Sequence, residues 1–155
     1  MNLAIIRAAV IAIVVVAVGI AYLRSLPPDI VAVGTPVRQD DFLYTVTRVV
    51  KHRTHENISY IATIRVDNQA KRVDYRWSDE NAYVTDSTGR RYAAVGSGSP
   101  DDRDRPPIAA GAFAEFDLAF VLPAAAQHPI LHYWNGIMMG DVFDGAAYGR
   151  AAVTL

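Results

Sequence analysis

Cysteine is absent from this chain of 155 residues. Without thiols there is no structural disulfide, no thiolate zinc site, no cysteine nucleophile and no lipid attachment of the lipoprotein type. Burial of apolar side chains therefore has to stabilise whatever fold the chain adopts.

An excess of charge of either sign is also missing. The chain has 15 Lys and Arg against 16 Asp and Glu, and the two signs are mixed along its length. A protein that binds nucleic acid needs a clustered basic face, so this balance argues against that class of partner.

Catalytic motifs are lacking as well. The sequence contains no Gly-x-Ser-x-Gly elbow, no phosphate-binding glycine loop and no dinucleotide fingerprint. Asp141 and Asp144 are possible paired carboxylates, but the glycines around them indicate turns. We therefore predict that the protein is not an enzyme and has no cofactor and no small-molecule substrate.

A long apolar run occurs once, at the N-terminus. The stretch from Leu3 to Leu23 contains a single charged residue, Arg7, and Pro27-Pro28 follows it. As a helix rising about 1.5 Å per residue, this stretch spans roughly 30 Å, the thickness of a bilayer core. The pattern predicts a transmembrane anchor and linker over residues 1–28 and an extracytoplasmic domain over residues 29–155.

A cleaved signal peptide is the alternative interpretation of the same segment. Gly19-Ile20-Ala21 is a passable cleavage site, and Arg7 forms a weak charged region before the apolar run. The run continues through Tyr22-Leu23, which favours an uncleaved single-pass anchor with the C-terminus outside. Both interpretations deliver the domain to the periplasm or the cell exterior.

From Asp29 onward the apolar pattern changes to the period of two that half-buried strands show. The predicted strands are residues 42–50, 58–66, 77–84, 90–95, 113–122, 130–134 and 151–155. About seven or eight short strands bounded by turns indicate an all-β fold, an antiparallel immunoglobulin-like β-sandwich. The alternation predicts a core that includes Tyr60, Ile64, Phe116, Leu118 and Phe120.

Turn residues separate these strands. Asp86 to Gly89 predicts a hairpin with Gly89 at the position that needs a positive φ, and Gly111 predicts the turn into the 113–122 strand. Ser97 to Pro107 has no apolar residue and is expected to be a surface loop. Its acids, Asp101, Asp102 and Asp104, alternate with arginines, so we expect solvated side chains and no calcium site.

Several pieces of the soluble part, in order, resemble a known family. They are Val33–Val37, Phe42–Val49, Tyr60–Asn68, Val84–Tyr92, and Ile108–Gly111 leading into Phe116–Pro123. This region resembles the bacterial immunoglobulin-like extracellular domains of unknown function found on lipoproteins and membrane-anchored proteins. Their fold is related to that of a mycobacterial immunoprotective secreted antigen. The resemblance implies a fold and an extracellular location, and it supplies no catalytic residues. Ala110-Gly111 stands where the family usually has Pro-Gly.

Histidine and methionine offer a possible metal site. The candidates are His52, His55, His128, His132, Met138 and Met139. Imidazole and thioether ligands suit copper or zinc. However, spacings of three and four residues place histidines together on a helix, and no helix is expected at either place. Surface or partly buried histidines are the favoured interpretation, and a periplasmic metal carrier is the alternative function.

A binding or scaffold module is therefore the function we expect. Tyr75, Trp77 and Tyr133 are candidate partner-binding residues, because exposed Tyr and Trp side chains anchor interfaces. The expected partners are an envelope protein or a second copy of the chain, and the membrane through the N-terminal segment. An undetected hydrolase is a third class that the sequence leaves open.

Overall fold

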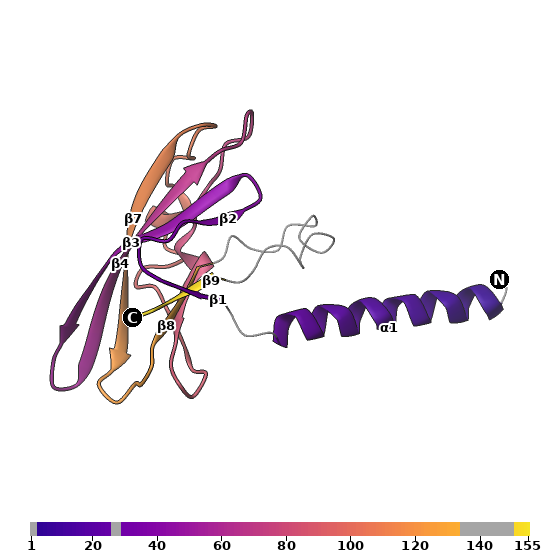
Figure 1. Ribbon diagram of the computed structural model, residues 1–155, viewed down its shortest axis with the longest axis horizontal. Helices are drawn as coiled ribbons and strands as arrows, with labels where there is room; N and C mark the ends of the chain where they lie inside the picture. The colour runs from indigo at the N-terminus through magenta and orange to yellow at the C-terminus, as the bar shows by residue number, and fades with distance from the viewer. Residues whose placement is uncertain (1–2, 26–28, 134–150) are drawn as a thin grey trace. The chain divides into compact units, whose positions relative to one another are not determined.

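The computed structural model describes residues 3–25, 29–133 and 151–155. The N-terminal part is the helix α1 (Leu3–Ser25), and a β-sandwich follows it (Figure 1). Among the described residues, no helix meets the requirements of length and apolarity for crossing a membrane. The membrane anchor stays a prediction from the sequence.

Two sheets form the sandwich. The four-stranded sheet has the order β2 (Val37–Gln39), β3 (Phe42–Arg53), β4 (Asn57–Asn68) and β7 (Phe113–Pro123). The five-stranded sheet has the order β1 (Asp29–Val31), β9 (Ala151–Thr154), β8 (Ile130–Tyr133), β5 (Ala82–Thr85) and β6 (Arg91–Ala93). All neighbours are antiparallel except β1 and β9, which run parallel. The predicted β-sandwich is confirmed.

The core lies between the inner faces of the two sheets, which is where alternation along each strand sends the apolar side chains. In β4, the side chains of Tyr60, Ile64 and Val66 are at most 1% exposed. In β7, Leu118 and Phe120 are equally buried, and both were predicted. Phe116, also predicted, is only half-buried, and its ring stacks on Trp77 with centroids 5.7 Å apart.

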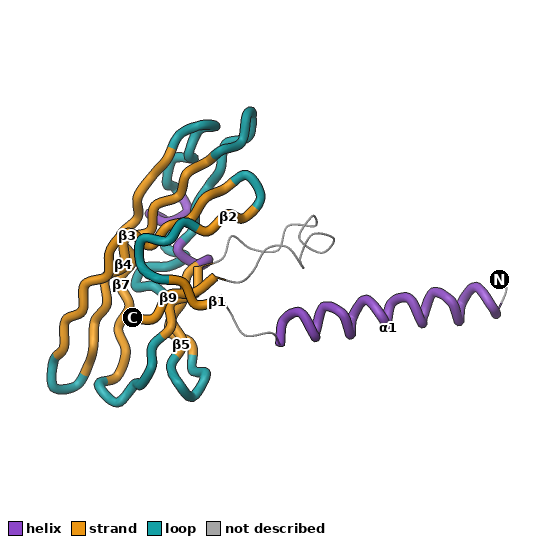
Figure 2. The backbone as a smooth tube through the Cα atoms, in the orientation of Figure 1, coloured by secondary structure: helices purple, strands orange, loops and turns teal. Residues whose placement is uncertain are grey.

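A bulge in β3 changes which residues face the core. The pairing with β4 shifts between Val46 and Arg48. Before the shift Val46 is buried, and after it Val49 packs against the core. Arg48 and Val50 therefore point to the outer face of the four-stranded sheet. The long strands β3, β4 and β7 lie side by side in Figure 2.

The predicted turns are present. The hairpin between β5 and β6 has Gly89 at φ +80°, and the turn before β7 has Gly111 at φ +78°. Asn68 ends β4, and its side-chain oxygen accepts a hydrogen bond from the Ala70 backbone N–H at 3.0 Å. The Asn68 amide also donates to the carbonyl of Ile108 at 2.9 Å, which ties two loops together.

The strand predicted over residues 77–84 is wrong in its first half. β5 begins only at Ala82, and the preceding residues Asp79–Asn81 form the short 3-10 helix η1. Trp77 lies in irregular chain before η1, and its indole N–H donates to the Asp79 carboxylate at 2.9 Å. Tyr75 makes one isolated antiparallel bridge with Ile108.

The loop predicted over residues 97–107 lies mostly at the surface, but the expectation that all its acids are solvated is wrong. The loop contains the helix α2 (Pro100–Arg103), and its Asp102 is buried. Asp102 accepts hydrogen bonds from the backbone N–H groups of Asp79 and Gly98 at 2.9 and 3.1 Å. Arg105 forms an ion pair with Asp79, so acids and arginines of this region neutralise each other inside the fold.

Candidate functional site

The three aromatic residues predicted to be exposed partner contacts are buried. Tyr75, Trp77 and Tyr133 are 7%, 1% and 1% exposed. Tyr75 and Trp77 pack in the core next to Tyr44, with ring centroids 6.3 and 6.1 Å away. Burial raises the pKa of Tyr133 to about 12. The prediction that these side chains are exposed is wrong, because all three belong to the core: Tyr133 points inward from β8, and Tyr75 and Trp77 pack next to the Tyr44 ring of β3.

The four histidines are spread over the sandwich. His52 lies on β3 in the four-stranded sheet, and His55 lies in the turn that follows. His132 lies on β8 in the other sheet, where its Nε2 is 2.8 Å from the Thr85 hydroxyl. His128 is exposed in the loop before β8. Within residues 3–25, 29–133 and 151–155, no three His, Asp or Glu side chains form a group that could hold a metal ion.

The remaining predicted candidates lie outside the described residues. They are Met138, Met139, Asp141 and Asp144. No geometry is assigned to them.

The buried acids are engaged in holding loops together. Burial of Asp102 acts to raise its pKa, but hydrogen bonds from the Asp79 and Gly98 backbones, from Ser78, and the charge of Arg105 bring that pKa below its ordinary value. A carboxylate held ionised by four neighbours is a poor proton shuttle, because a general acid or base needs a pKa near the working pH. This cluster is a structural link between η1 and α2.

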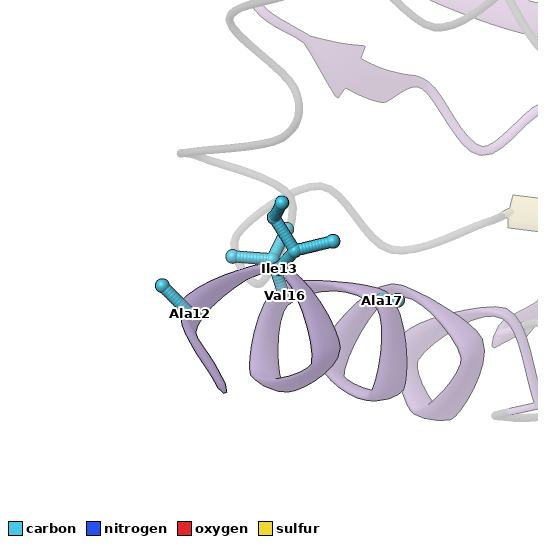
Figure 3. A pocket seen from close by; sticks show the side chains of 4 residues that line it. All are labelled: Ala12, Ile13, Val16 and Ala17. Carbon is cyan, nitrogen blue, oxygen red and sulfur yellow. The ribbon is translucent and has the colours of Figure 1, made fainter. Parts of the chain in front are cut away.

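A shallow apolar hollow runs along α1 (Figure 3). Ala12, Ile13, Val16 and Ala17 line it. All four come from neighbouring turns of one helix, and they offer no charged or polar side chain to orient a ligand. The hollow has the character of an apolar helix surface.

The outer face of the four-stranded sheet carries a contiguous group of exposed apolar side chains. Val50, Ile61 and Ala119 are direct neighbours across β3, β4 and β7. Val121 stands one outward position further along β7. Val50, Ile61 and Val121 are 44%, 42% and 46% exposed. We call these four residues the apolar patch.

The apolar patch continues beyond the edge of the sheet. The backbone N–H of Val95 donates to the carbonyl of Ala119 at 2.7 Å, which brings the segment after β6 alongside β7. Val95 is 63% exposed. The apolar patch thus crosses three strands, and a further exposed apolar residue lies beside its β7 edge, whereas exposed apolar residues of ordinary surfaces are scattered singly.

A row of polar side chains borders the apolar patch. Arg48, Thr63 and Asp117 are direct neighbours on β3, β4 and β7, and we call them the charged row. The Thr63 hydroxyl donates to Asp117 at 2.5 Å and accepts from Arg48 Nε at 3.4 Å. Arg48 and Asp117 are 3.8 Å apart, with side chains 62% and 58% exposed. Both charges are therefore accessible to a partner.

A second charged group lies further along the same face. Arg65 forms an ion pair with Asp67, with atoms 2.7 Å apart, and its guanidinium lies 3.8 Å from the centre of the Phe113 ring. The hydrogen bond to Asp67 raises the pKa of Arg65, desolvation opposes it, and the charges of Asp67 and Glu115 add to the rise. The outer face thus presents an apolar area with charged residues on one side of it.

Alternation along the strands was the signal that could have revealed this surface. Ile61 stands between the inward-facing Tyr60 and Ala62, and Val121 stands between Phe120 and Leu122. An apolar residue at an outward position of a half-buried strand departs from the expected pattern. The outward orientation of Val50 could not be predicted in this way, because the bulge in β3 reverses the inward–outward alternation of the residues that follow it.

Comparison of the sequence with known protein families and with curated proteins finds no match. Solved structures with a similar fold are found. The yjhA protein from Bacillus subtilis is 14% identical with a TM-score of 0.54, covering 80% of this chain and 98% of that chain. The secreted protein MPT63 from Mycobacterium tuberculosis is 14% identical with a TM-score of 0.56, covering 84% and 100%. An uncharacterized β-sandwich protein from Clostridium difficile 630 is 8% identical with a TM-score of 0.55, covering 84% and 97%. At these identities the likeness shows the β-sandwich fold alone.

Proposed function

We propose that this protein is a non-enzymatic binding module of the cell envelope, an immunoglobulin-like domain on a single-pass anchor that contacts another protein through the apolar patch. The patch is the observation that carries the proposal. Val50, Ile61 and Val121 are each more than 40% exposed and lie together on one sheet. A contiguous apolar surface of this kind marks an interaction site, because covering it removes apolar area from water.

The sheet itself suits a protein partner. β3, β4 and β7 are the longest strands of the sandwich, with 12, 12 and 11 residues. A broad sheet face held by the core behind it is a rigid surface, so its side chains lose little freedom on binding. The charged row beside the patch supplies the polar rim that protein interfaces have.

The immunoglobulin-like assignment rests on the resemblance together with the fold. Three of the pieces that carry the resemblance fall in β3, β4 and the β5–β6 hairpin, and Phe116–Pro123 falls in β7. Val33–Val37 leads into β2, and Ile108–Gly111 precedes β7. The similar solved structures include one described as a secreted protein, which agrees with an extracytoplasmic location.

The anchor rests on the sequence of α1. This helix has 23 residues, and Ile11, Ile13 and Val15 are more than 60% exposed on it. We propose an N-in, C-out span with residues 29–155 outside. A reporter that is active only outside the cytoplasm, fused after Leu155, should be active, and a cytoplasmic reporter at the same place should be silent. The opposite result would refute the orientation.

The binding proposal is tested in cells by photo-crosslinking. A photoreactive amino acid in place of Ile61 should give a crosslinked protein product. The matched control is Ile30, which is 52% exposed on β1 of the other sheet and should give none. Crosslinked products from both Ile61 and Ile30 would indicate non-specific contact. If neither position gives a crosslinked product, the apolar patch does not bind a partner and the proposed function is wrong.

A further inference from the structure

We infer that the partner of the apolar patch is a second copy of this chain, packed face to face on the outer surface of the four-stranded sheet. The inference rests on the proposed function and specifies its partner. It follows from the way that charges and apolar side chains are distributed about β4.

A two-fold axis parallel to β4, lying between the two copies, brings β3 of each copy over β7 of the other. β4 then lies over β4. Residues that share a row within one sheet also share that row across the interface, because rotation about an axis along the strands leaves the position along the strand unchanged. The observed register defines the rows: Arg48 with Thr63 and Asp117, and Val50 with Ile61 and Ala119.

In the apolar row this arrangement matches apolar with apolar. Ile61 meets Ile61 of the second copy near the axis, and Val50 meets Ala119 of the second copy on both sides of it. A large side chain thus lies over a small one, as in well-packed sheet interfaces. All three residues are accessible in one copy, Val50 and Ile61 at 44% and 42%.

In the charged row the same rotation places opposite charges together twice. Arg48 meets Asp117 of the second copy, and Asp117 meets Arg48 of the second copy. Within one copy these two side chains are 3.8 Å apart and both hydrogen-bond to Thr63, yet they stay more than half exposed. Such a surface pair contributes little by itself, so its members are available for a partner.

On the axis Arg65 lies over Arg65 of the second copy, and Asp67 neutralises each guanidinium within its own copy. In the row beyond Ile61, Val121 meets His52 of the second copy.

Other symmetric arrangements fit less well. A two-fold axis across the strands through the charged row places Arg48 against Arg48 and Asp117 against Asp117. An axis across the strands through the apolar row places Asp117 against the apolar Val121 and Arg48 against His52. The axis along β4 also brings Arg65 over Arg65 and Asp67 over Asp67, but each of these charges is neutralised by the Arg65–Asp67 ion pair of its own copy. It is the arrangement of the three that pairs Arg48 with Asp117, so we choose it on the charges of that row.

The first test mixes two charge variants of the purified full-length chain in detergent. Arg48→Asp alone and Asp117→Arg alone each bring like charges together twice, so we expect a dimer dissociation constant at least about tenfold higher. Mixed together, the two variants have opposite charges at both contacts, and the heterodimer should recover the original affinity. Energy transfer between copies with donor and acceptor dyes at their amino termini measures this. A mixture no tighter than the separate variants would overturn the inference.

The second test uses the absence of cysteine from the natural chain. Ile61→Cys should be joined into dimers by a short bis-maleimide reagent, because facing sheets lie about 10 Å apart, too far for a direct disulfide. Ile30→Cys, on the other sheet, should remain monomeric. If Ile61→Cys stays monomeric while photo-crosslinking at Ile61 in cells captures a different protein, the self-association is wrong and the proposed function stands. If neither experiment gives a crosslinked product, both the self-association and the proposed binding function are wrong.

Discussion

Asp79 receives its counter-charge from Arg105 inside the fold. The Asp79 carboxylate accepts from the Trp77 indole at 2.9 Å and from the Arg105 guanidinium at 2.7 Å, and its residue is 5% exposed. Removing the guanidinium leaves a buried negative charge without its partner. Arg105→Met should therefore lower the free energy of unfolding by about 3 kcal/mol. Chemical denaturation measures the change.

Arg53→Met is the matched control for this change. Arg53 is exposed and makes one weak contact of 3.5 Å to the Ala124 carbonyl. Its replacement should alter the free energy of unfolding by less than about 0.5 kcal/mol. Equal effects of the two substitutions would contradict the structural role assigned to the Asp79–Arg105 pair.

Asp86 should make stability depend on acid pH. The hydrogen bond from the Thr88 hydroxyl, opposed by desolvation and supported by bonds from Tyr92 and the turn backbone, lowers the pKa of Asp86 from 3.8 to about 2. A carboxyl group with a depressed pKa in the folded state contributes stability above its unfolded pKa, and the contribution is lost as pH falls toward the folded value. Asp86→Asn should thus be destabilising at neutral pH, and the difference from the natural chain should disappear near pH 2. A carbon-detected NMR titration of Asp86 with a midpoint near 4 would contradict this.

The burial of the three candidate partner-binding aromatic residues could not be predicted from the sequence. Tyr75, Trp77 and Tyr133 stand in segments with weak alternation, so composition alone suggested exposed interface anchors. In the fold all three are part of the core, with at most 7% exposure. Asp102 was predicted to be solvated but is buried. Its hydrogen-bond donors, the backbone N–H groups of Asp79 and Gly98, come from other segments that only the fold brings next to it.

At the scale of elements, β7 offers a sharp test of the inside–outside pattern. Phe120 is fully buried, and Val121 beside it is 46% exposed on the outer face. Phe120→Ala should cost about 3–5 kcal/mol of folding free energy, because it removes a ring from a packed core. Val121→Ala should change it by less than about 0.5 kcal/mol. Thermal melts of the two variants measure this, and a smaller loss for Phe120→Ala than for Val121→Ala would reverse the assigned faces.

The long strands could be predicted from the sequence, and so could the short strands β6, β8 and β9, which lie within the predicted ranges 90–95, 130–134 and 151–155. Of the strands that the structure describes, only β1 and β2 were not predicted. β3, β4 and β7 carry a sustained period of two, so their positions were predicted to within a few residues of the observed bounds. β1 and β2 have three residues each, which is too short for any period. The bulge in β3 is a feature of how β3 pairs with β4, so the sequence of β3 alone does not reveal it. For this reason the outward orientation of Val50 could not be predicted.

At the scale of the whole molecule, residues 29–155 should fold without the N-terminal segment and without metal. About 125 residues are enough for one apolar core, and sandwiches of that size are ordinary independent domains. The buried faces of β3, β4 and β7 supply the apolar area. A fragment lacking the first 28 residues should melt cooperatively, with a β-type circular dichroism spectrum, in a strong chelator.

Two results would contradict independent folding. A fragment that is disordered until copper or zinc is added would favour the metal-carrier function. A fragment that stays disordered with either metal would show that the sandwich needs a partner to fold.

The parallel pairing of β1 with β9 has a mechanical consequence. β1 follows the N-terminal segment directly, and its three residues pair in register with Ala151, Ala152 and Val153 of β9. Pulling residues 29 and 155 in opposite directions slides these strands along each other, so their hydrogen bonds are loaded together and not one after another. A tether attached ahead of Asp29 and opposed by a force at residue 155 would therefore load this strand pair in shear.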